Sequence, residues 1–135
     1  MRNENPPNRR LPTWLKRPKD LRGLRDIRLK LRQAGLHTVC EEARCPNMAE
    51  CFARRDATFL ILGPICTRSC SFCGIEQGIP RAPDEDEPAR VAAAAEALGL
   101  RHVVITSVTR DDLPDKGAQA FADAITEIRR KRPKA

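Results

Sequence analysis

The 135-residue sequence has few aromatic residues, only two histidines and no long apolar run, and these shortages narrow the possible classes of protein. No stretch approaches the ~20 consecutive apolar residues that a membrane-spanning helix needs. Residues 1–10 are polar and contain no apolar core of a secretory signal peptide. We therefore expect a cytoplasmic protein with no membrane partner, in which six cysteines indicate metal binding before disulfide formation.

Positive charge is concentrated at the amino-terminal end. Residues 1–32 hold eleven Lys or Arg and three Asp or Glu, whereas the remainder of the chain has slightly more acidic than basic residues. Trp14 is the only aromatic residue of this basic segment, which therefore offers no platform for base stacking, and we expect no nucleic-acid partner. Two explanations of this charge stay equal alternatives: the segment binds an acidic protein surface, or it is a basic helix that is merely solvated.

Three cysteines, Cys66, Cys70 and Cys73, lie close together at the spacing C-x3-C-x2-C. They follow an apolar run, residues 58–62, that is closed by Gly63-Pro64. This order predicts a buried strand, a turn and a thiol-bearing loop at the strand's carboxyl end. Three neighbouring thiols cannot all pair as disulfides, but they can converge on one soft ion or one cluster. Structural zinc and iron–sulfur clusters usually take four protein ligands, so three cysteines leave one metal position open.

A second group of three cysteines, Cys40, Cys45 and Cys51, precedes the strand at the spacing C-x4-C-x5-C. Pro46 is well placed to open a short helix, which would put Cys51 on its second turn. Here too a fourth ligand is missing. The strand between the two groups could carry the chain from one metal site to the other.

The remaining elements alternate between strands and helices. Residues 1–19 are rich in proline and predict an extended arm, and residues 20–36 predict an amphipathic helix capped by Asp20 and ended at Gly35. After a loop over 74–83 come a helix over 87–98, a strand over 101–108 and a helix over 118–132. The expected apolar face of that last helix is Phe121, Ala124, Ile125 and Ile128. Such alternation is typical of a parallel α/β sheet or barrel.

A full eight-unit barrel averages about 250 residues, so residues 58–135 would supply about two and a half units. We therefore expect the chain to be a truncated form. Of the two histidines, His37 is expected to be a hydrogen-bonded structural residue and His102 a residue at a strand edge.

The motifs resemble those of the lipoyl synthase family, within the radical S-adenosylmethionine (SAM) enzymes. The resemblance rests on the two cysteine spacings and on residues 36–47, 57–63 and 104–115. It implies an α/β fold in which residues 58–135 form the first strands and helices of a radical-SAM partial (β/α) barrel. Residues 1–57 would be an amino-terminal, cysteine-rich extension that carries the basic arm.

The resemblance also implies a reaction and its cofactors. Cys66, Cys70 and Cys73 would hold a [4Fe-4S] cluster whose open iron binds SAM, which is then cleaved to a 5′-deoxyadenosyl radical. The other three cysteines would hold an auxiliary [4Fe-4S] cluster that serves as the sulfur source. The family inserts two sulfur atoms at C6 and C8 of an octanoyl chain on a lysine of a carrier protein. The carriers are E2 subunits or the glycine cleavage H protein, and a ferredoxin or flavodoxin would donate electrons.

Contacts to SAM are expected at the carboxyl end of the second strand, where catalytic groups of parallel barrels lie. The residues there are Thr106, Ser107, Arg110 and Asp111, and Phe72 beside the third cysteine of its motif is a further candidate. Loop capping and turn formation is the alternative role for this polar loop.

Two departures from the family pattern stand out. Lys116 occupies a position where the family has glycine, which we expect only if its φ is negative. The serine that completes the auxiliary cluster in the family belongs to a region beyond this sequence, so we expect the chain to be inactive alone. The alternative functions are a non-catalytic iron–sulfur module and a zinc-binding interaction module.

Overall fold

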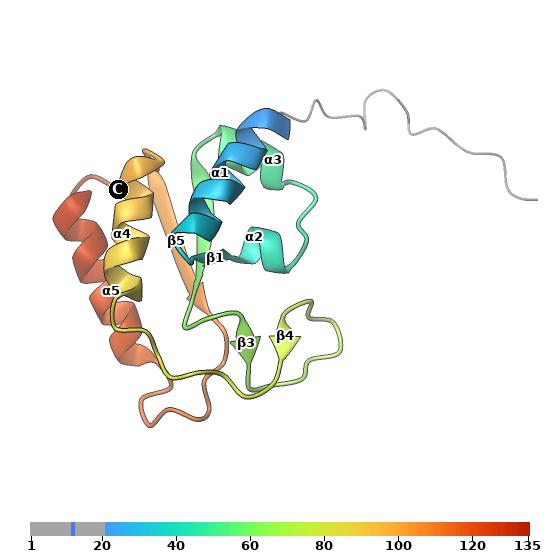
Figure 1. Ribbon diagram of the computed structural model, residues 1–135, viewed down its shortest axis with the longest axis vertical. Helices are drawn as coiled ribbons and strands as arrows, with labels where there is room; N and C mark the ends of the chain where they lie inside the picture. Colours follow the sequence, from blue (N-terminus) through green and yellow to red (C-terminus); the bar gives the residue numbers. More distant parts are fainter. Residues whose placement is uncertain (1–11, 13–20) are drawn as a thin grey trace, which may run out of the picture.

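The computed structural model describes residue 12 and residues 21–135, which form a small mixed α/β unit (Figure 1). Its central strand is β2 (Asp56–Ile61), the apolar run expected from the sequence. β2 pairs in parallel with β5 (His102–Ser107) and antiparallel with the short strand β1 (His37–Thr38). Across the described residues the sheet has the order β1-β2-β5 and does not close into a barrel.

The parallel pairing of β2 and β5 depends on a long crossover that contains α4 (Glu87–Ala97). Pro88 lies in the first turn of α4, and Gly99, at φ +60°, turns the chain back toward β5. The helix α5 (Ala118–Lys131) follows β5 and packs beside α4 (Figure 1). The expected alternation of strands and helices is therefore confirmed over this part of the chain.

The crossover also holds a small second sheet. β3 (Ile65–Cys66) pairs in parallel with β4 (Glu76–Gln77), which closes the segment between them into a loop (Figure 1). The sequence predicted an irregular loop over residues 74–83, so this pairing was missed. A two-residue strand has no periodicity that a pattern could reveal.

Amino-terminal to β2 lie three helices: α1 (Leu21–Gln33), α2 (Val39–Glu42) and α3 (Met48–Ala53). The helix predicted over residues 20–36 is confirmed as α1, and Gly35 ends it at φ +62°. The Asp20 cap and the basic arm lie outside the described residues. The short helix expected after Pro46 is present, although it begins at Met48.

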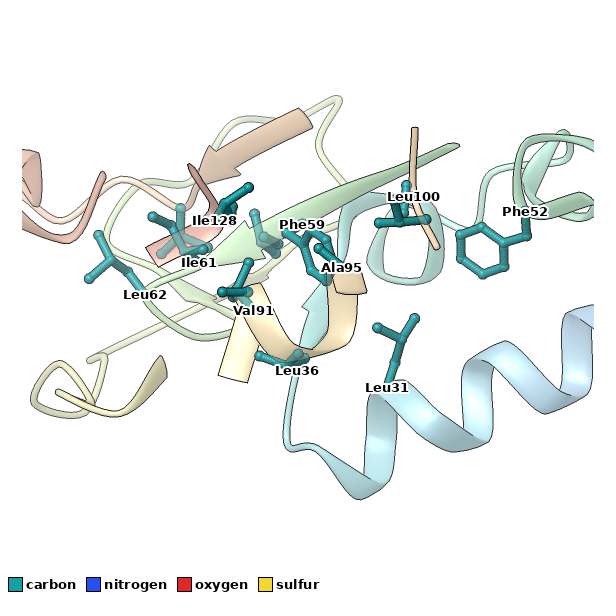
Figure 2. Close-up of a cluster of buried hydrophobic side chains, with 14 residues drawn as sticks. Leu31, Leu36, Phe52, Phe59, Ile61, Leu62, Val91, Ala95, Leu100 and Ile128 are labelled. Carbon is teal, nitrogen blue, oxygen red and sulfur yellow. The ribbon is translucent and has the colours of Figure 1, made fainter. Parts of the chain in front are cut away.

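One hydrophobic core joins the amino-terminal helices to the sheet. Leu31 of α1, Phe59 of β2 and Ala95 of α4 are fully buried, and Figure 2 shows their side chains converging from the three elements. Ile128 of α5 closes the core from the other side. The expected amino-terminal extension, which ends at residue 57, and the segment that follows it thus bury their apolar surface in one core. Burial of this kind is the main source of stability for so small a unit.

The predicted apolar face of α5 was partly wrong. Ala124 and Ile128 are buried and Phe121 packs against the core, but Ile125 is 41% exposed. The described helices include none that is long and apolar enough to cross a membrane.

Candidate metal centre

The first cysteine group is built on helices. Cys40 lies in α2 and Cys51 in α3, and Cys45 in the connecting turn donates its N–H to the Cys40 carbonyl at 3.0 Å. Thr38 is completely buried and caps α2 by accepting the Glu41 N–H. All three thiols are half-buried. Burial raises the pKa of Cys40, and the neighbouring Cys45 and Cys51 raise it further because their charges repel a thiolate.

The second cysteine group lies on the loop between β3 and β4. Cys66 is the last residue of β3 and is half-buried, whereas Cys70 and Cys73 are exposed. Phe72, between them, is 90% exposed. Exposure to solvent therefore increases from the first cysteine of the loop to the other two.

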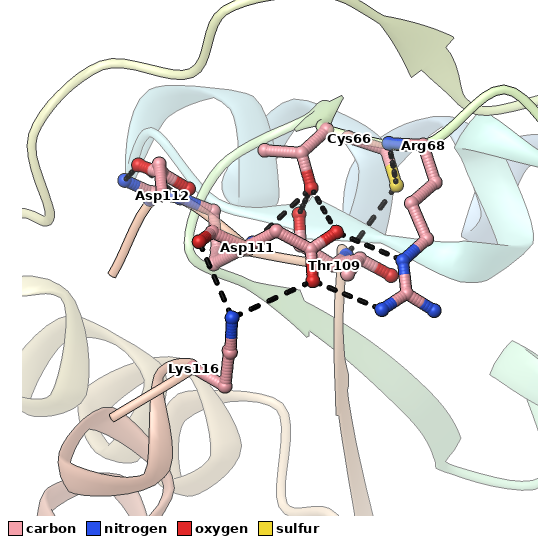
Figure 3. Close-up of polar contacts among 8 residues, drawn as sticks. Cys66, Arg68, Thr109, Asp111, Asp112 and Lys116 are labelled. Atoms are coloured by element: carbon pink, nitrogen blue, oxygen red, sulfur yellow. Dashed lines mark hydrogen bonds and ion pairs between the residues drawn. The ribbon is translucent and has the colours of Figure 1, made fainter. Parts of the chain in front are cut away.

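Cys66 is bound by the loop that follows β5. Its Sγ accepts N–H groups from Thr109, at 3.4 Å, and from Arg68, at 3.5 Å (Figure 3). Thr67 completes the connection by donating its N–H and its hydroxyl to the Thr109 carbonyl. Burial alone would raise the pKa of Cys66, but the amide donors outweigh it and lower the pKa below its ordinary value. Such N–H donors favour the thiolate, which is the form that binds metal.

A bidentate salt bridge also joins the cysteine loop to the loop that follows β5. Arg68 places Nε 2.8 Å and Nη2 2.9 Å from the two carboxylate oxygens of Asp111 (Figure 3). The Thr67 hydroxyl also lies 3.1 Å from Asp111 Oδ2. Arg68, followed by Thr67, lowers the pKa of Asp111 to about 2. The sequence flagged Asp111 as a SAM contact but gave no sign of its pairing with Arg68, 43 residues away.

Lys116 corrects an expectation. It lies at φ +56°, in the left-handed region, although a lysine was expected there only at negative φ. Its Nζ donates to the Asp111 carbonyl at 3.3 Å, and it lies 3.8 Å from Asp111 Oδ1. The side chain therefore gains partners that glycine could not provide, which offsets part of the steric cost.

The other expected SAM contacts differ in their accessibility. Thr106 and Ser107 are half-buried at the carboxyl end of β5, opposite Leu60 and Ile61 of β2. Arg110 is only 2% exposed, and its guanidinium is occupied by Asp112 and by the carbonyls of Leu62 and Arg81. His37 is hydrogen-bonded to Glu42, as expected of a structural residue, and His102 is the exposed first residue of β5.

The segment after Cys73 lies against the end of α2, the helix that carries Cys40. A methyl group at Gly74, directly after Cys73, would lie 3.5 Å from the Glu42 carbonyl oxygen at the end of α2. Within residue 12 and residues 21–135, however, no three Cys, His, Asp or Glu side chains stand together as metal ligands. All six thiols are free, and soft thiolates suit iron–sulfur clusters. The donor chemistry thus fits two clusters, for which the thiols of each group have to come closer together.

Comparison with known families decides the assignment. The family model of the radical SAM superfamily matches residues 60–133, more than half of the chain. The chain belongs to the radical SAM superfamily. The model of the N-terminal domain of lipoyl synthase, itself described as a radical SAM family member, matches residues 1–45.

Individual relatives agree with this placement. The lipoyl synthase of Caldanaerobacter subterraneus subsp. tengcongensis is 57% identical over 90% of this chain and 43% of its own length. Those of Proteus mirabilis and Rubrobacter xylanophilus are 56% and 57% identical over 92% and 90% of this chain, and 39% and 38% of their own lengths. The chain therefore spans about two fifths of the length of these relatives.

Proposed function

We propose that this radical SAM chain is the cysteine-bearing portion of a lipoyl synthase. The reaction would insert two sulfur atoms at C6 and C8 of an octanoyl chain on a carrier lysine, to give a lipoyl group. The observation that carries the proposal is the placement of the second free-thiol loop, which is bonded to Thr109 after β5 and meets, at Gly74, the end of the helix that carries Cys40. High identity to lipoyl synthases over nine tenths of the chain supports it.

Cys66, Cys70 and Cys73 would hold a SAM-binding [4Fe-4S] cluster, and Cys40, Cys45 and Cys51 would hold an auxiliary one. When bound, the first would supply the electron that cleaves SAM and the second would supply sulfur. The amide donors on Cys66 stabilise the thiolate that such a ligand requires. The half-buried setting of the other group keeps its ligands partly out of water.

Thr106, Ser107, Asp111 and Phe72 would contact SAM, and each lies on or beside β5 or the cysteine loop. Arg110 was expected to join them, but its guanidinium is buried and bonded to Asp112 and to the carbonyls of Leu62 and Arg81. Residues 1–57 would be an extension, and residues 58–135 the start of a partial (β/α) barrel. The partners would be octanoylated E2 or H-protein domains and a ferredoxin or flavodoxin.

Metal content tests the proposal most directly. Anaerobic reconstitution with iron and sulfide should give about eight irons per chain, and about four after replacement of all three cysteines of either group. In a chain extended to the length of the relatives, SAM, a reductant and an octanoylated carrier should give product heavier by two sulfurs. Two clusters without SAM cleavage would indicate a non-catalytic iron–sulfur module. Stoichiometric zinc with no iron uptake would indicate a zinc module.

A further inference from the structure

Leu62, the residue that follows β2, has an unusual backbone. Its φ is +69°, a left-handed conformation that is sterically disfavoured for a residue with a branched side chain. Such conformations persist only where the surrounding structure holds them. Leu62 leads through Gly63 and Pro64 into β3, whose last residue is Cys66. The direction in which the chain leaves β2 therefore sets the position of the first cysteine of the loop.

Two buried charged residues hold the backbone of Leu62 from different elements. Glu87, the first residue of α4, accepts the Leu62 N–H at 2.8 Å and is 6% exposed. Arg110, on the loop after β5, donates Nη1 to the Leu62 carbonyl at 3.4 Å and is 2% exposed. Both polar groups of Leu62 are thus satisfied by side chains and not by the sheet.

The side chain of Leu62 is held as firmly as its backbone. It is 5% exposed within the core, and its Cδ1 occupies the space that a methyl group on Gly117, at the start of α5, would need. Leu62 precedes the cysteine loop in the sequence, yet it contacts three segments that follow this loop. They are the start of α4, the loop after β5 and the start of α5. Neither Glu87 nor Leu62 belongs to a cysteine motif or to the candidate SAM contacts.

We infer that Glu87 and Arg110 are positioning residues that hold Leu62 in its left-handed conformation and thereby fix the path of the chain into Cys66. The inference rests on the proposed function in that Cys66 is a cluster ligand. The contrasting explanation is that Glu87 serves α4 alone, because a carboxylate at a helix N-terminus is favourable whatever it contacts.

Amide hydrogen exchange on the metal-free chain separates these explanations without any cluster. Glu87→Ala removes the acceptor, so exchange over residues 62–66 should accelerate on the order of ten-fold while residues 90–97 of α4 keep their protection. Glu87→Gln keeps a carbonyl oxygen of the same reach and should resemble the native chain. Glu85→Ala, an exposed acidic position just before α4, is the matched control and should change neither segment. Equal loss in the loop and in α4, or no acceleration in the loop, would overturn the inference.

A second arm measures iron at the Cys66 group alone, in a chain whose other three cysteines are replaced. Glu87→Ala should lower the iron bound several-fold, and Glu87→Gln should restore it. Leu62→Gly supplies an internal test, because glycine adopts positive φ without steric cost. Because Glu87 would then have no disfavoured conformation to hold, Glu87→Ala should have little further effect on iron binding in the Leu62→Gly background.

The outcomes distinguish the inference from the proposed function. No iron in the native chain would count against the proposed function, while the exchange arm would still decide the role of Glu87. Full iron binding by Glu87→Ala, or an equal defect in Glu87→Gln, would contradict the positioning role. If Glu87→Ala does not fold, Glu87→Asp replaces it. Aspartate keeps the charge at the start of α4 but reaches about one methylene less far, so the inference expects a defect and the helix explanation expects none.

Discussion

The two cysteine groups differ in how much of the protein holds them. Cys40, Cys45 and Cys51 lie on or between helices that pack against β2, and their thiols are half-buried. Of the other group, Cys66 alone receives hydrogen bonds from outside the loop among the described residues, and Cys70 and Cys73 are exposed. The same ligand chemistry is thus built once on helices packed against the sheet and once on a largely exposed loop.

The difference agrees with the two proposed roles. A cluster that binds SAM needs access for a small molecule, which an exposed loop provides. A cluster that gives up sulfur needs protection from water until the substrate arrives, which a half-buried site on helices favours.

The largest effect should come from removing one ligand of each group, in a chain extended to the length of the relatives. Cys70→Ala should abolish 5′-deoxyadenosine formation, because the SAM-binding cluster loses a ligand. Cys45→Ala should leave SAM cleavage intact and abolish sulfur insertion. Chromatography of 5′-deoxyadenosine and the mass of the carrier would report the two steps separately. Equal SAM cleavage in both variants would contradict the assignment of roles.

Two phenylalanines allow the same contrast to be tested through stability. Phe59 is fully buried in β2 opposite Thr38 of β1, and Phe72 is 90% exposed on the loop of the second cysteine group. Phe59→Ala should lower the free energy of unfolding by about 3–5 kcal/mol, whereas Phe72→Ala should change it by less than about 0.5 kcal/mol. Urea unfolding of the metal-free chain would measure both. Similar costs would show that the loop is packed far more tightly than its exposure indicates.

Much of the fold around the two cysteine groups could be predicted from the sequence, because it follows from strong local patterns. The apolar run of β2 and the amphipathic period of α1 each identify an element without reference to the rest of the chain. The two cysteine spacings likewise identified both groups. Ile125 was misplaced because its helical spacing fits the core face, and only packing in three dimensions shows that it is 41% exposed.

The contacts that fix the loop could not be predicted, because each joins residues far apart in sequence. Glu87 had the pattern of an ordinary acidic residue in the first turn of a helix, yet it binds Leu62, 25 residues earlier. Arg110 was assigned to SAM on its position after a strand, and only the structure shows its buried internal partners. The short strands β1, β3 and β4 exist only through pairing, which local propensity does not encode.

A smaller effect is expected from the ion pair that ties the loop to the β5–α5 connection. Arg68→Lys keeps the positive charge but cannot form the bidentate salt bridge with Asp111. Amide exchange over residues 67–69 should accelerate by about a few-fold, because exposed pairs contribute little individually. Arg130→Lys, at an exposed Arg–Glu pair on α5, is the matched control and should leave the loop unchanged. Identical exchange in both variants would show that the ion pair between Arg68 and Asp111 does not hold the loop.

The pH dependence of this pair follows from the lowered pKa of Asp111. Its carboxylate should contribute to loop protection above its ordinary pKa of 3.8, and the contribution should be lost as the pH falls through about 2. Asp111→Asn should remove this pH dependence. Loop protection lost already between pH 7 and pH 5 would contradict the assignment to Asp111.

The smallest expected effect comes from Lys116, whose φ is +56°. At this position the steric cost of the lysine side chain and the entropic cost of a glycine are of similar size. The left-handed backbone costs a lysine about 1–2 kcal/mol, whereas glycine loses about 0.5–1 kcal/mol more conformational entropy on folding. Lys116→Gly should therefore raise the free energy of unfolding by no more than about 1 kcal/mol, measured by thermal unfolding. Lys116→Ala keeps the strained φ and removes only the contacts of the amine with Asp111, so it should be no more stable than the native chain. If Lys116→Gly is instead destabilising, the contacts of the amine with Asp111 outweigh the backbone strain, and Lys116 helps to hold the β5–α5 connection that binds the cysteine loop.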